Sequence, residues 1–316
     1  MAIENKVILS GQISSLKCKV VEDLIQMKKF KSWRMRVRVY RRQLPDFDEE
    51  GTRLVRDNIA VYFRDAMMSW ELETKNFKRH DMIEIYGMLT STPGRWTCKC
   101  TQCGAVFKAD RIITGVRPLF FRKMEPLSEY DIKDMAYDEN NEYEDMDFEE
   151  NGREDVEDEE VKKQKELDKK YFFAGKNLTE KRIELSNRIR VIGNLTADPN
   201  LFISNRGISI CTYQIAVSRS IFVPEDPENI DTDFLWIRSI GENADKDYEM
   251  LRKGSLVYIE GSLQSKFDYE QLIKCPNCGN EYRQKNTTGT VEILAEKILR
   301  IRNLKEKEGI IDGEPS

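Results

Sequence analysis

The feature that most limits the fold of this chain is a degenerate repeat, in which five kinds of segment recur in the same order in two halves. The first four are short stretches that alternate polar and apolar residues, the pattern of a half-buried β-strand, and the fifth is a pair of cysteines. Because the order of all five is kept, we interpret the chain as two copies of one β-rich unit. The paired segments are Asn5–Ile13 with Asn187–Leu195, Arg36–Arg41 with Gln214–Arg219, Asp57–Phe63 with Asp233–Ser239, Lys78–Leu89 with Arg252–Leu263, and Cys100–Gly104 with Cys275–Gly279.

Each copy has the elements of a small closed barrel. A fifth strand follows each cysteine pair, at Asp110–Val116 and Thr290–Ile301, and a short helix is expected between the third and fourth strands, at Ala66–Phe77 and Glu242–Leu251. The fourth strand of each copy carries a glycine, which lets a strand bend sharply in a barrel. The predicted fold class is therefore all-β, with two barrels in tandem.

An acidic segment separates the two copies. Residues 125–160 contain 18 Asp and Glu against two basic residues, whereas the rest of the chain has 49 Lys and Arg against 38 Asp and Glu. A like-charge block of this density repels itself and buries too little apolar surface to offset chain entropy, so we expect a disordered linker. The predicted organisation is a first barrel at 1–124, the acidic linker at 125–160, a short helical connector at 161–186, a second barrel at 187–305 and a tail at 306–316.

The residue types that are present exclude several classes of function. The chain has one histidine, His80, so it cannot form a site that needs two imidazoles, and it lacks the glycine-rich phosphate-binding motifs of nucleotide-dependent enzymes. No apolar run approaches the ~20 residues that cross a bilayer, and the first residues lack the layout of a signal peptide. We therefore expect a cytoplasmic protein that is not an enzyme and does not contact membranes.

Four segments of the second copy carry a more specific pattern: NRIRVIGNLTADPNL (Asn187–Leu201), YQIAVSRS (Tyr213–Ser220), TDFLWIRSIG (Thr232–Gly241) and LRKGSLVYIEGSLQS (Leu251–Ser265). With these segments the second copy resembles the oligonucleotide-binding barrel, or OB-fold, of bacterial single-stranded DNA-binding proteins. Through the repeat, the resemblance extends in weaker form to the first copy. It implies a tandem of two OB-folds that binds single-stranded DNA without sequence preference in replication, repair or recombination.

The resemblance also implies where bases would stack. Phe234 falls where the family has a stacking aromatic residue, whereas Ile240 falls where a second one is usual. The family places further rings in the loop after the second strand and in the hairpin between the fourth and fifth strands, where Phe222, Phe267 and Tyr269 are the nearest candidates. Replication or repair proteins and further copies of the chain, in a homo-oligomer, are the protein partners that the family implies.

Cations and rings in the second copy fit this chemistry independently of the resemblance. Binding a single strand needs positive side chains for the phosphates and flat rings for the bases, each stacked base contributing ~1–3 kcal/mol. Alternation puts Phe234 and Trp236 on one face of their strand and Leu235 and Ile237 on the other, where they can fill the core. The cationic candidates in this copy are Arg190, Arg219, Arg238, Arg252, Lys253 and Lys266.

The first copy has a basic stripe of its own. Alternation along its second strand puts arginines on one face and apolar residues on the other, and arginine favours forked contacts with phosphate groups. A solvated outer face is the alternative interpretation of the stripe. Trp70, in the expected helix, is assigned to the core. The binding candidates in the first copy are Trp33, Arg34, Arg36, Arg38, Tyr40 and Trp96.

The two cysteine pairs predict a metal centre. Zinc prefers four thiolate or imidazole ligands in a tetrahedron, and each C-x-x-C-G turn supplies two. We expect one structural Zn²⁺ within the chain. The alternatives are a zinc shared between chains, redox-active dithiols and free thiols, with Cys98 as a replacement ligand; Cys18 and Cys211 are expected to be small buried residues. The predicted ligands are Cys100, Cys103, Cys275 and Cys278.

The acidic segment admits two interpretations. Members of the family that the chain resembles usually end in an acidic tail with a hydrophobic tip, whereas here the acidic block lies inside the chain. It is either a solubilising spacer or an anion mimic that covers the arginine stripe until DNA displaces it. For the whole chain, the alternative functions are RNA binding and a non-catalytic scaffold for protein interactions.

Overall fold

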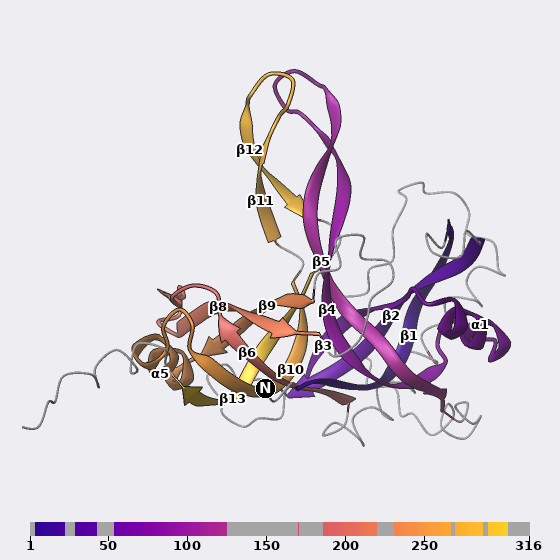
Figure 1. The fold of residues 1–316 in the computed structure, drawn as a ribbon, viewed down its shortest axis with the longest axis horizontal. Helices are drawn as coiled ribbons and strands as arrows, with labels where there is room; N and C mark the ends of the chain where they lie inside the picture. Colours follow the sequence, from indigo (N-terminus) through magenta and orange to yellow (C-terminus); the bar gives the residue numbers. More distant parts are fainter. Residues whose placement is uncertain are drawn as a thin grey trace, which may run out of the picture.

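The computed structural model describes residues 4–22, 29–42, 54–124, 170, 186–219, 231–266, 269–286 and 290–302. Within them, one 11-stranded sheet closes into two barrels, and a separate two-stranded sheet forms a hairpin (Figure 1). The predicted all-β fold with two barrels is confirmed. The acidic linker, almost all of the connector and the tail lie outside the described residues. Among the described residues, no helix is both long and apolar enough to cross a lipid bilayer.

The first barrel closes through its first strand. β1 pairs antiparallel with both β2 and β4, whereas β3 and β5 are parallel neighbours. The helix between the third and fourth strands begins after Asp65, whose carboxylate accepts hydrogen bonds from the N–H groups of Met67 and Met68. The elements are β1 (Asn5–Glu22), β2 (Lys29–Arg42), β3 (Leu54–Phe63), α1 (Ala66–Thr74), β4 (Met82–Lys99) and β5 (Val106–Lys123).

The second barrel repeats this connectivity. β6 takes the place of β1 and pairs with β8 and β10, and β9 and β13 are the parallel neighbours. The short strand β7 extends the sheet beside β8, and the hairpin of β11 and β12 is inserted between β10 and β13. The elements are β6 (Asn187–Leu195), β7 (Asn200–Ile203), β8 (Ser209–Ser218), β9 (Thr232–Ile240), α5 (Glu242–Met250), β10 (Leu256–Lys266), β11 (Tyr269–Lys274), β12 (Glu281–Asn286) and β13 (Thr290–Arg302).

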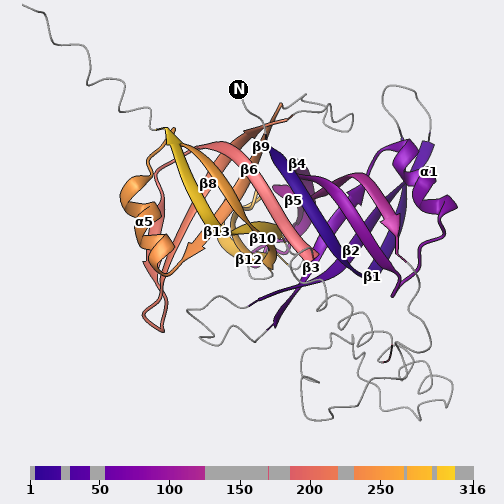
Figure 2. The same ribbon diagram turned by 90° about the horizontal axis from the view of Figure 1, so that it is seen from below.

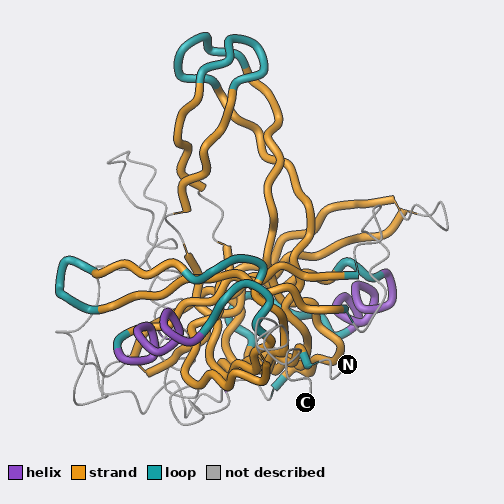
Figure 3. The backbone as a smooth tube through the Cα atoms, turned by 60° about the vertical axis from the view of Figure 1, so that its left-hand side comes forward, coloured by secondary structure: helices purple, strands orange, loops and turns teal. Residues whose placement is uncertain are grey.

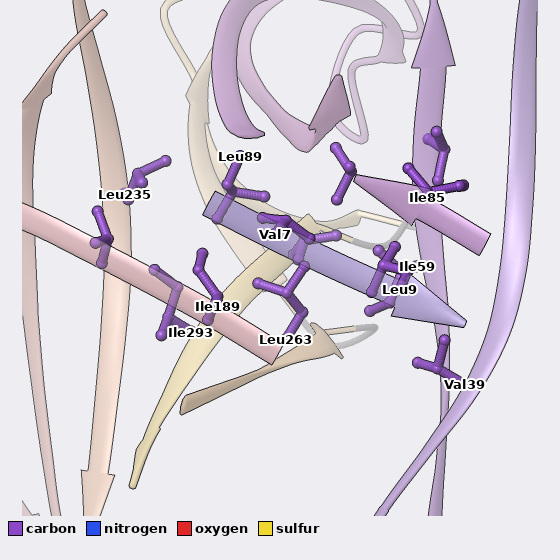
Figure 4. Packing of buried hydrophobic residues seen from close by; sticks show 14 of the residues in the cluster. Val7, Leu9, Val39, Ile59, Ile85, Leu89, Ile189, Leu235, Leu263 and Ile293 are labelled. Atoms are coloured by element: carbon purple, nitrogen blue, oxygen red, sulfur yellow. The ribbon is translucent and has the colours of Figure 1, made fainter. Parts of the chain in front are cut away.

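Alternation along the strands fills the interiors of both barrels. On β9, Leu235 and Ile237 are buried, whereas Phe234 and Trp236 face outward, as predicted. The two interiors merge into a single cluster of buried apolar residues, part of which is drawn in Figure 4. Because each fully buried Val, Leu or Ile side chain contributes about 1.5–3 kcal/mol, this cluster stabilises the two barrels as one unit.

Backbone hydrogen bonds confirm the register of the repeat. The N–H of His80 donates to the carbonyl oxygen of Ile13 at 2.8 Å, and the N–H of Gly254 donates to that of Leu195 at 2.8 Å. The two donors are equivalent in the repeat, and both have a positive φ, 74° for His80 and 84° for Gly254. This backbone conformation favours glycine, which is the residue that the second copy has there.

The glycine of each fourth strand lies where that strand crosses its neighbour most closely. A Cβ atom on Gly87 would lie 2.3 Å from the carbonyl oxygen of Arg117, and one on Gly261 would lie 2.1 Å from that of Leu294. The strand register shifts directly before each glycine. Any side chain would therefore force the strands apart, which is the physical reason for the bend that the sequence predicted.

The two barrels are joined by their first strands. β1 and β6 pair antiparallel, from Asn5 opposite Val191 to Leu9 opposite Asn187, so the sheet runs through both barrels (Figure 2). The side chain of Asn5 donates to the carbonyl oxygen of Leu89 at 2.8 Å and accepts from the N–H of the same residue at 3.0 Å. Asn187 makes the same pair of bonds with Leu263, at 2.7 and 2.9 Å. An approximate two-fold axis therefore relates the barrels.

Two buried polar triads cross this junction. Each consists of an Arg and an Asp from one barrel and a Ser from the other. In one, Arg219 lies 2.9 Å from the carboxylate of Asp233, which accepts a hydrogen bond from the N–H of Ser91 at 2.7 Å. In the other, the corresponding distances are 3.0 and 2.9 Å. Oδ1 of each carboxylate thus accepts hydrogen bonds from the opposite barrel only while the barrels are in contact. The triads are Arg41, Asp57 and Ser265, and Arg219, Asp233 and Ser91.

A buried carboxyl group lies under α5. This helix buries Ala244 and Asp247 on one face, and the hydroxyl of Tyr213 donates to the Asp247 carboxylate at 3.2 Å. Burial raises the pKa of Asp247 to about 6 and raises the pKa of Tyr213 well above its ordinary value. The charged form of Asp247 is therefore unfavourable in the folded chain.

Two predictions of burial are wrong. Trp70 is 66 % exposed, because α1 buries only Ser69 and Leu72 and its apolar face is narrow. Cys18 is exposed because β1 beyond Gln12 pairs only with β2 among the described strands, outside the closed part of the barrel. Alternation along a strand does not say where that strand leaves the barrel. Cys211 is buried, as predicted.

Replacing Asp233 with alanine tests the junction. Asp233→Ala leaves the guanidinium of Arg219 buried without its carboxylate, and removing one partner of a buried ion pair costs about 3–5 kcal/mol. We expect urea unfolding of the full chain to show this loss. Asp231→Ala, at an exposed carboxylate two residues away, is the matched control and should change the free energy of unfolding by less than about 0.5 kcal/mol. Equal stability of both variants would contradict the role of the triad.

Ionisation of Asp247 is expected to weaken the fold as the pH rises from about 4 to about 6. The folded chain keeps the proton of Asp247 up to about pH 6, whereas the unfolded chain releases it near pH 3.8. The contribution of this proton to the free energy of unfolding is therefore complete below pH 3.8 and is lost as the pH passes 6. Asp247→Asn should therefore gain about 1–3 kcal/mol over wild type between pH 4 and pH 7 in urea unfolding. Asp245→Asn, exposed on the same helix, is the control. A difference that stays constant with pH would refute this assignment.

Candidate nucleic-acid interface and metal centre

The outer face of β8 and β9 carries exposed rings. Phe234 is 36 % exposed and Trp236 is 46 % exposed, and both project from the side of β9 opposite the buried Leu235. Their partners across β8 are Ala216 and Gln214, which carry no charge and, in the case of Ala216, little bulk. Both rings are therefore accessible for stacking, as alternation predicted.

Arg238 lies on the same face of β9, and a carboxylate compensates its charge. Its Nε atom lies 2.9 Å from a carboxylate oxygen of Glu292 on the neighbouring strand β13. Glu292 is buried and also accepts a hydrogen bond from the side-chain amide of Gln264 at 2.6 Å. The guanidinium is thus fixed beside the exposed rings, but its charge is largely neutralised locally.

Arginines line the equivalent face of the first barrel. Met35, Val37 and Val39 of β2 are buried, so the alternating Arg34, Arg36 and Arg38 lie on the outer side, where each is partly exposed. This confirms the two faces predicted for that strand.

Arg38 shows the electrostatic character of this face. It donates to the side-chain oxygen of Gln12 at 2.9 Å. Burial lowers the pKa of Arg38 to about 10, and the nearby charges of Arg56 and Arg79 lower it further, whereas Tyr40 raises it. The guanidinium remains protonated at neutral pH and lies near two further positive side chains.

Tyr62 on β3 belongs to the same face and was missed by the sequence analysis. Its ring lies between two guanidinium groups, with Cζ of Arg34 5.7 Å and Cζ of Arg64 4.7 Å from the ring centre. Arg64 also donates to the hydroxyl of Thr92 at 2.9 Å, and a small pocket beside these residues is lined by Arg117 as well. Alternation along β3, whose neighbouring positions are buried, could have placed Tyr62 outward.

Two predicted contacts with nucleic acid lie inside the protein instead. Arg219 belongs to a junction triad, and its side chain is only 3 % exposed. Tyr40 is 4 % exposed, although it continues the alternation of the arginine stripe, and its backbone N–H donates to the hydroxyl of Ser186 at 3.5 Å. Neither side chain can reach a strand in this conformation.

The remaining predicted residues are scattered. Trp33 is half-buried, and its indole N–H donates to Glu73 at 3.2 Å, whereas Arg190 is exposed and lies 3.2 Å from a carboxylate oxygen of Glu260. Phe222 and Phe267 lie outside the described residues. The backbones of three others are placed in β4, β10 and β11, but their side chains are not among those described; they are Trp96, Lys266 and Tyr269.

The four predicted ligand cysteines come together. The hairpin of β4 and β5 and the hairpin of β11 and β12 rise from the two barrels and meet at their tips (Figures 1 and 3). Sγ of Cys100 lies 3.6 Å from Sγ of Cys278, and Sγ of Cys103 lies 3.7 Å from Sγ of Cys275. All four sulfur atoms lie within 4.8 Å of one another, and Cys98 is not among them.

The turn that carries each cysteine pair has the same backbone geometry. The N–H of Gly104 donates to the carbonyl oxygen of Cys100 at 3.1 Å, and the N–H of Gly279 donates to that of Cys275 at 3.0 Å. The two glycines have φ values of 72° and 73°, which residues with a side chain rarely adopt. The glycine of the C-x-x-C-G pattern therefore closes each turn and directs both sulfur atoms toward the other hairpin.

The cluster fits a tetrahedral metal ion. A Zn–S bond of about 2.3 Å gives a sulfur tetrahedron with edges of about 3.8 Å, close to the two distances of 3.6 and 3.7 Å between sulfur atoms of opposite hairpins. The backbone N–H of Cys103 lowers the pKa of Cys100 to about 6, and the backbone N–H of Ala105 lowers the pKa of Cys103. Backbone groups thus stabilise thiolates in the first hairpin, the form in which cysteine binds metals, whereas burial and the hydrogen bonds with the other three cysteines raise the pKa of Cys278 to about 12.

Comparisons with known proteins agree on one family. Residues 186–273 match the model of the single-strand binding protein family. A single-stranded DNA-binding protein of Bacillus cereus is 30 % identical over 135 residues, which are 42 % of this chain and 71 % of the relative. One from Bacillus anthracis is 31 % identical over 133 residues, which are 41 % of this chain and 69 % of the relative.

A solved structure is similar over both barrels. The crystal structure of the wild-type single-stranded DNA binding protein from Thermus aquaticus matches 96 % of this chain and 95 % of that chain, with a TM-score of 0.50 and 16 % sequence identity. At this identity the similarity concerns the fold alone. It extends the likeness to the first barrel, which the family model does not match.

Proposed function

Because this chain belongs to the single-strand binding protein family, we propose that it binds single-stranded DNA without sequence preference, by phosphate capture and base stacking. The observation that carries the proposal is the exposure of Phe234 and Trp236 on the outer face of β9, where a base can stack on each ring. The family is non-catalytic, and no catalytic residue is assigned. The process that the binding serves is replication, repair or recombination, in which single strands are exposed.

The binding surface spans the outer faces of both barrels. Cations on this surface attract phosphates and release their counterions, and exposed rings stack bases. Arg219 and Tyr40 are left out, since both side chains are buried. The described residues assigned to the surface are Arg34, Arg36, Arg38, Tyr62, Arg64, Arg190, Phe234, Trp236 and Arg238. Trp33, Trp96, Phe222, Lys266, Phe267 and Tyr269 are retained from the sequence analysis.

The cysteine cluster is assigned to one structural Zn²⁺ per chain. Its support is the spacing of the sulfur atoms, the identical turns and the origin of the four ligands in a single chain. The ion would supply a fixed link between the hairpins of the two barrels, with no part in chemistry. The hydroxyl of Tyr282 on β12 donates to the carbonyl oxygen of Lys99 on β4 at 3.2 Å, which adds a second contact between the hairpins.

The domain limits are proposed from the sequence, and the described strands are consistent with them. The first domain is assigned to residues 1–124 and the second to 187–305, and their described strands run from Asn5 to Lys123 and from Asn187 to Arg302. The acidic linker at 125–160, the connector at 161–186 and the tail at 306–316 complete the proposed organisation.

Fluorescence titration of the full chain tests DNA binding. Poly(dT) is expected to quench tryptophan fluorescence, and log affinity should fall with log salt with a slope of about −0.7 per phosphate contacted. Trp236→Leu should reduce the quenching, whereas Trp70→Leu, at an exposed tryptophan on α1 outside the proposed surface, should not. Equal affinity for poly(dT) and a matched DNA duplex would contradict the proposal. Stronger binding of a matched RNA oligomer would favour the RNA-binding alternative.

Atomic emission on the purified chain, together with its mass under native conditions, tests the metal centre. About one zinc per chain is expected, and it should be held by the monomer as well as by any oligomer. Cys103→Ser should lose most of the zinc because three thiolates cannot complete the tetrahedron. Cys18→Ser, at an exposed cysteine outside the cluster, is the control and should keep the metal. A wild-type chain without zinc, or with zinc only in a dimer, would refute an intrachain site.

A further inference from the structure

The two barrels present equivalent positions on their outer faces. The junction triads make Arg41 equivalent to Arg219 and Asp57 equivalent to Asp233, which fixes the register of β2 against β8 and of β3 against β9. The cross-strand pairs then correspond one to one. Arg34–Tyr62, Arg36–Ala60 and Arg38–Asn58 in the first barrel match Thr212–Arg238, Gln214–Trp236 and Ala216–Phe234 in the second.

At two of the three matched pairs, the barrels carry opposite kinds of binding group. Arg36 and Arg38 of the first barrel face a small or polar partner on β3, whereas the equivalent positions on β8 are neutral. The rings Phe234 and Trp236 of the second barrel occupy positions where β3 has Asn58 and Ala60. One barrel thus has cations without rings at these pairs, and the other has rings without cations.

The third matched pair separates the barrels by how their cations are balanced. In the first barrel, the guanidinium of Arg34 contacts a neutral group, the ring of Tyr62, with Cζ 5.7 Å from the ring centre. In the second barrel, Arg238 lies 2.9 Å from the carboxylate of Glu292. A phosphate near Arg238 would meet a neutralised pair, whereas one near Arg34 would meet a cation that contacts a neutral ring.

We propose that the two barrels hold a single strand by different physical interactions, the first by phosphate capture through Arg34, Arg36 and Arg38, and the second by base stacking on Phe234 and Trp236. The division rests on the proposed binding of single-stranded DNA and goes beyond it, because it assigns each interaction to one half of the chain. As a consequence of this division, salt weakens the binding of the strand by the first barrel, since only ionic contacts release counterions. The hold of the second barrel persists at high salt.

The experiment measures the affinity of the full chain for a dT oligomer over a series of salt concentrations. R34Q/R36Q/R38Q removes three cations and is expected to lower the slope of log affinity against log salt by about 2, at about 0.7 for each phosphate that is no longer neutralised. Quenching of Trp236 at saturation should remain. F234L/W236L should lower the affinity by about 30-fold or more at every salt concentration and leave the slope unchanged, since two bases no longer have a ring on which to stack.

Two further variants distinguish the effect of the three arginine charges from a folding defect and from a general loss of positive charge. R34K/R36K/R38K keeps the three charges and should restore most of the slope, which a merely misfolded first barrel would not. K246Q/K274Q/K297Q removes three exposed cations from the second barrel and should leave the slope within about 0.5 of wild type. An equal decrease of the slope in this variant and in R34Q/R36Q/R38Q would overturn the division, and so would a decrease of the slope in F234L/W236L.

The outcome also distinguishes this inference from the proposed function. If the wild-type chain fails to bind the dT oligomer at low salt, the proposed function is wrong and the division falls with it. If the wild type binds with a clear salt slope that the three glutamines do not change, the function stands and the division alone is refuted.

Discussion

The antiparallel pairing of β1 with β6 is the interaction on which the rest of this structure depends. It joins the two barrels edge to edge, so that β1 is hydrogen-bonded to β4 and β6 along its first half, and neither first strand is left as an open edge. The pairing also brings Asp57 and Asp233 against the opposite barrel, where each accepts a hydrogen bond from the backbone N–H of a serine. Because these carboxylates are buried, a shift of one barrel against the other would leave charges without partners. The buried carboxylates therefore fix the register of one barrel against the other, in addition to holding the two barrels in contact.

A fixed junction also explains how four cysteines from distant parts of the chain can form one cluster. The hairpins that carry them start on different barrels, and their tips meet only if both barrels keep one orientation (Figure 3). Since the junction has already brought the hairpins together, closing the cluster with a metal ion would restrict little further freedom of the folded chain. The cluster would then stabilise the tips of the hairpins, far from the junction, where strand pairing alone leaves a narrow two-stranded ribbon.

Much of this architecture could be predicted from the repeat, because equivalent residues have the same backbone conformation and make the same contacts between strands. His80 and Gly254 share a positive φ, and Gly87 and Gly261 share a close approach between strands. Alternation also predicted the outward rings of β9. What sequence could not supply was the identity of the neighbour that covers each face. Arg219 looked like a surface cation, and only the position of Ser91 on the other barrel reveals it as a junction residue.

The comparison of the two halves separates structural positions from the proposed binding positions. Under an approximate two-fold axis, both halves meet the same surroundings at the junction, so the same residue types satisfy them twice: Asn5 and Asn187, Arg41 and Arg219, Asp57 and Asp233. No such requirement acts on the outer faces, and there the halves differ. Arg38 stands where the second barrel has Ala216, and Trp236 stands where the first has Ala60. A polynucleotide has both phosphates and bases. A chain with two unlike barrels can bind the phosphates with one barrel and stack the bases on the other. Two identical barrels could do both only if each barrel carried cations and rings on the same face.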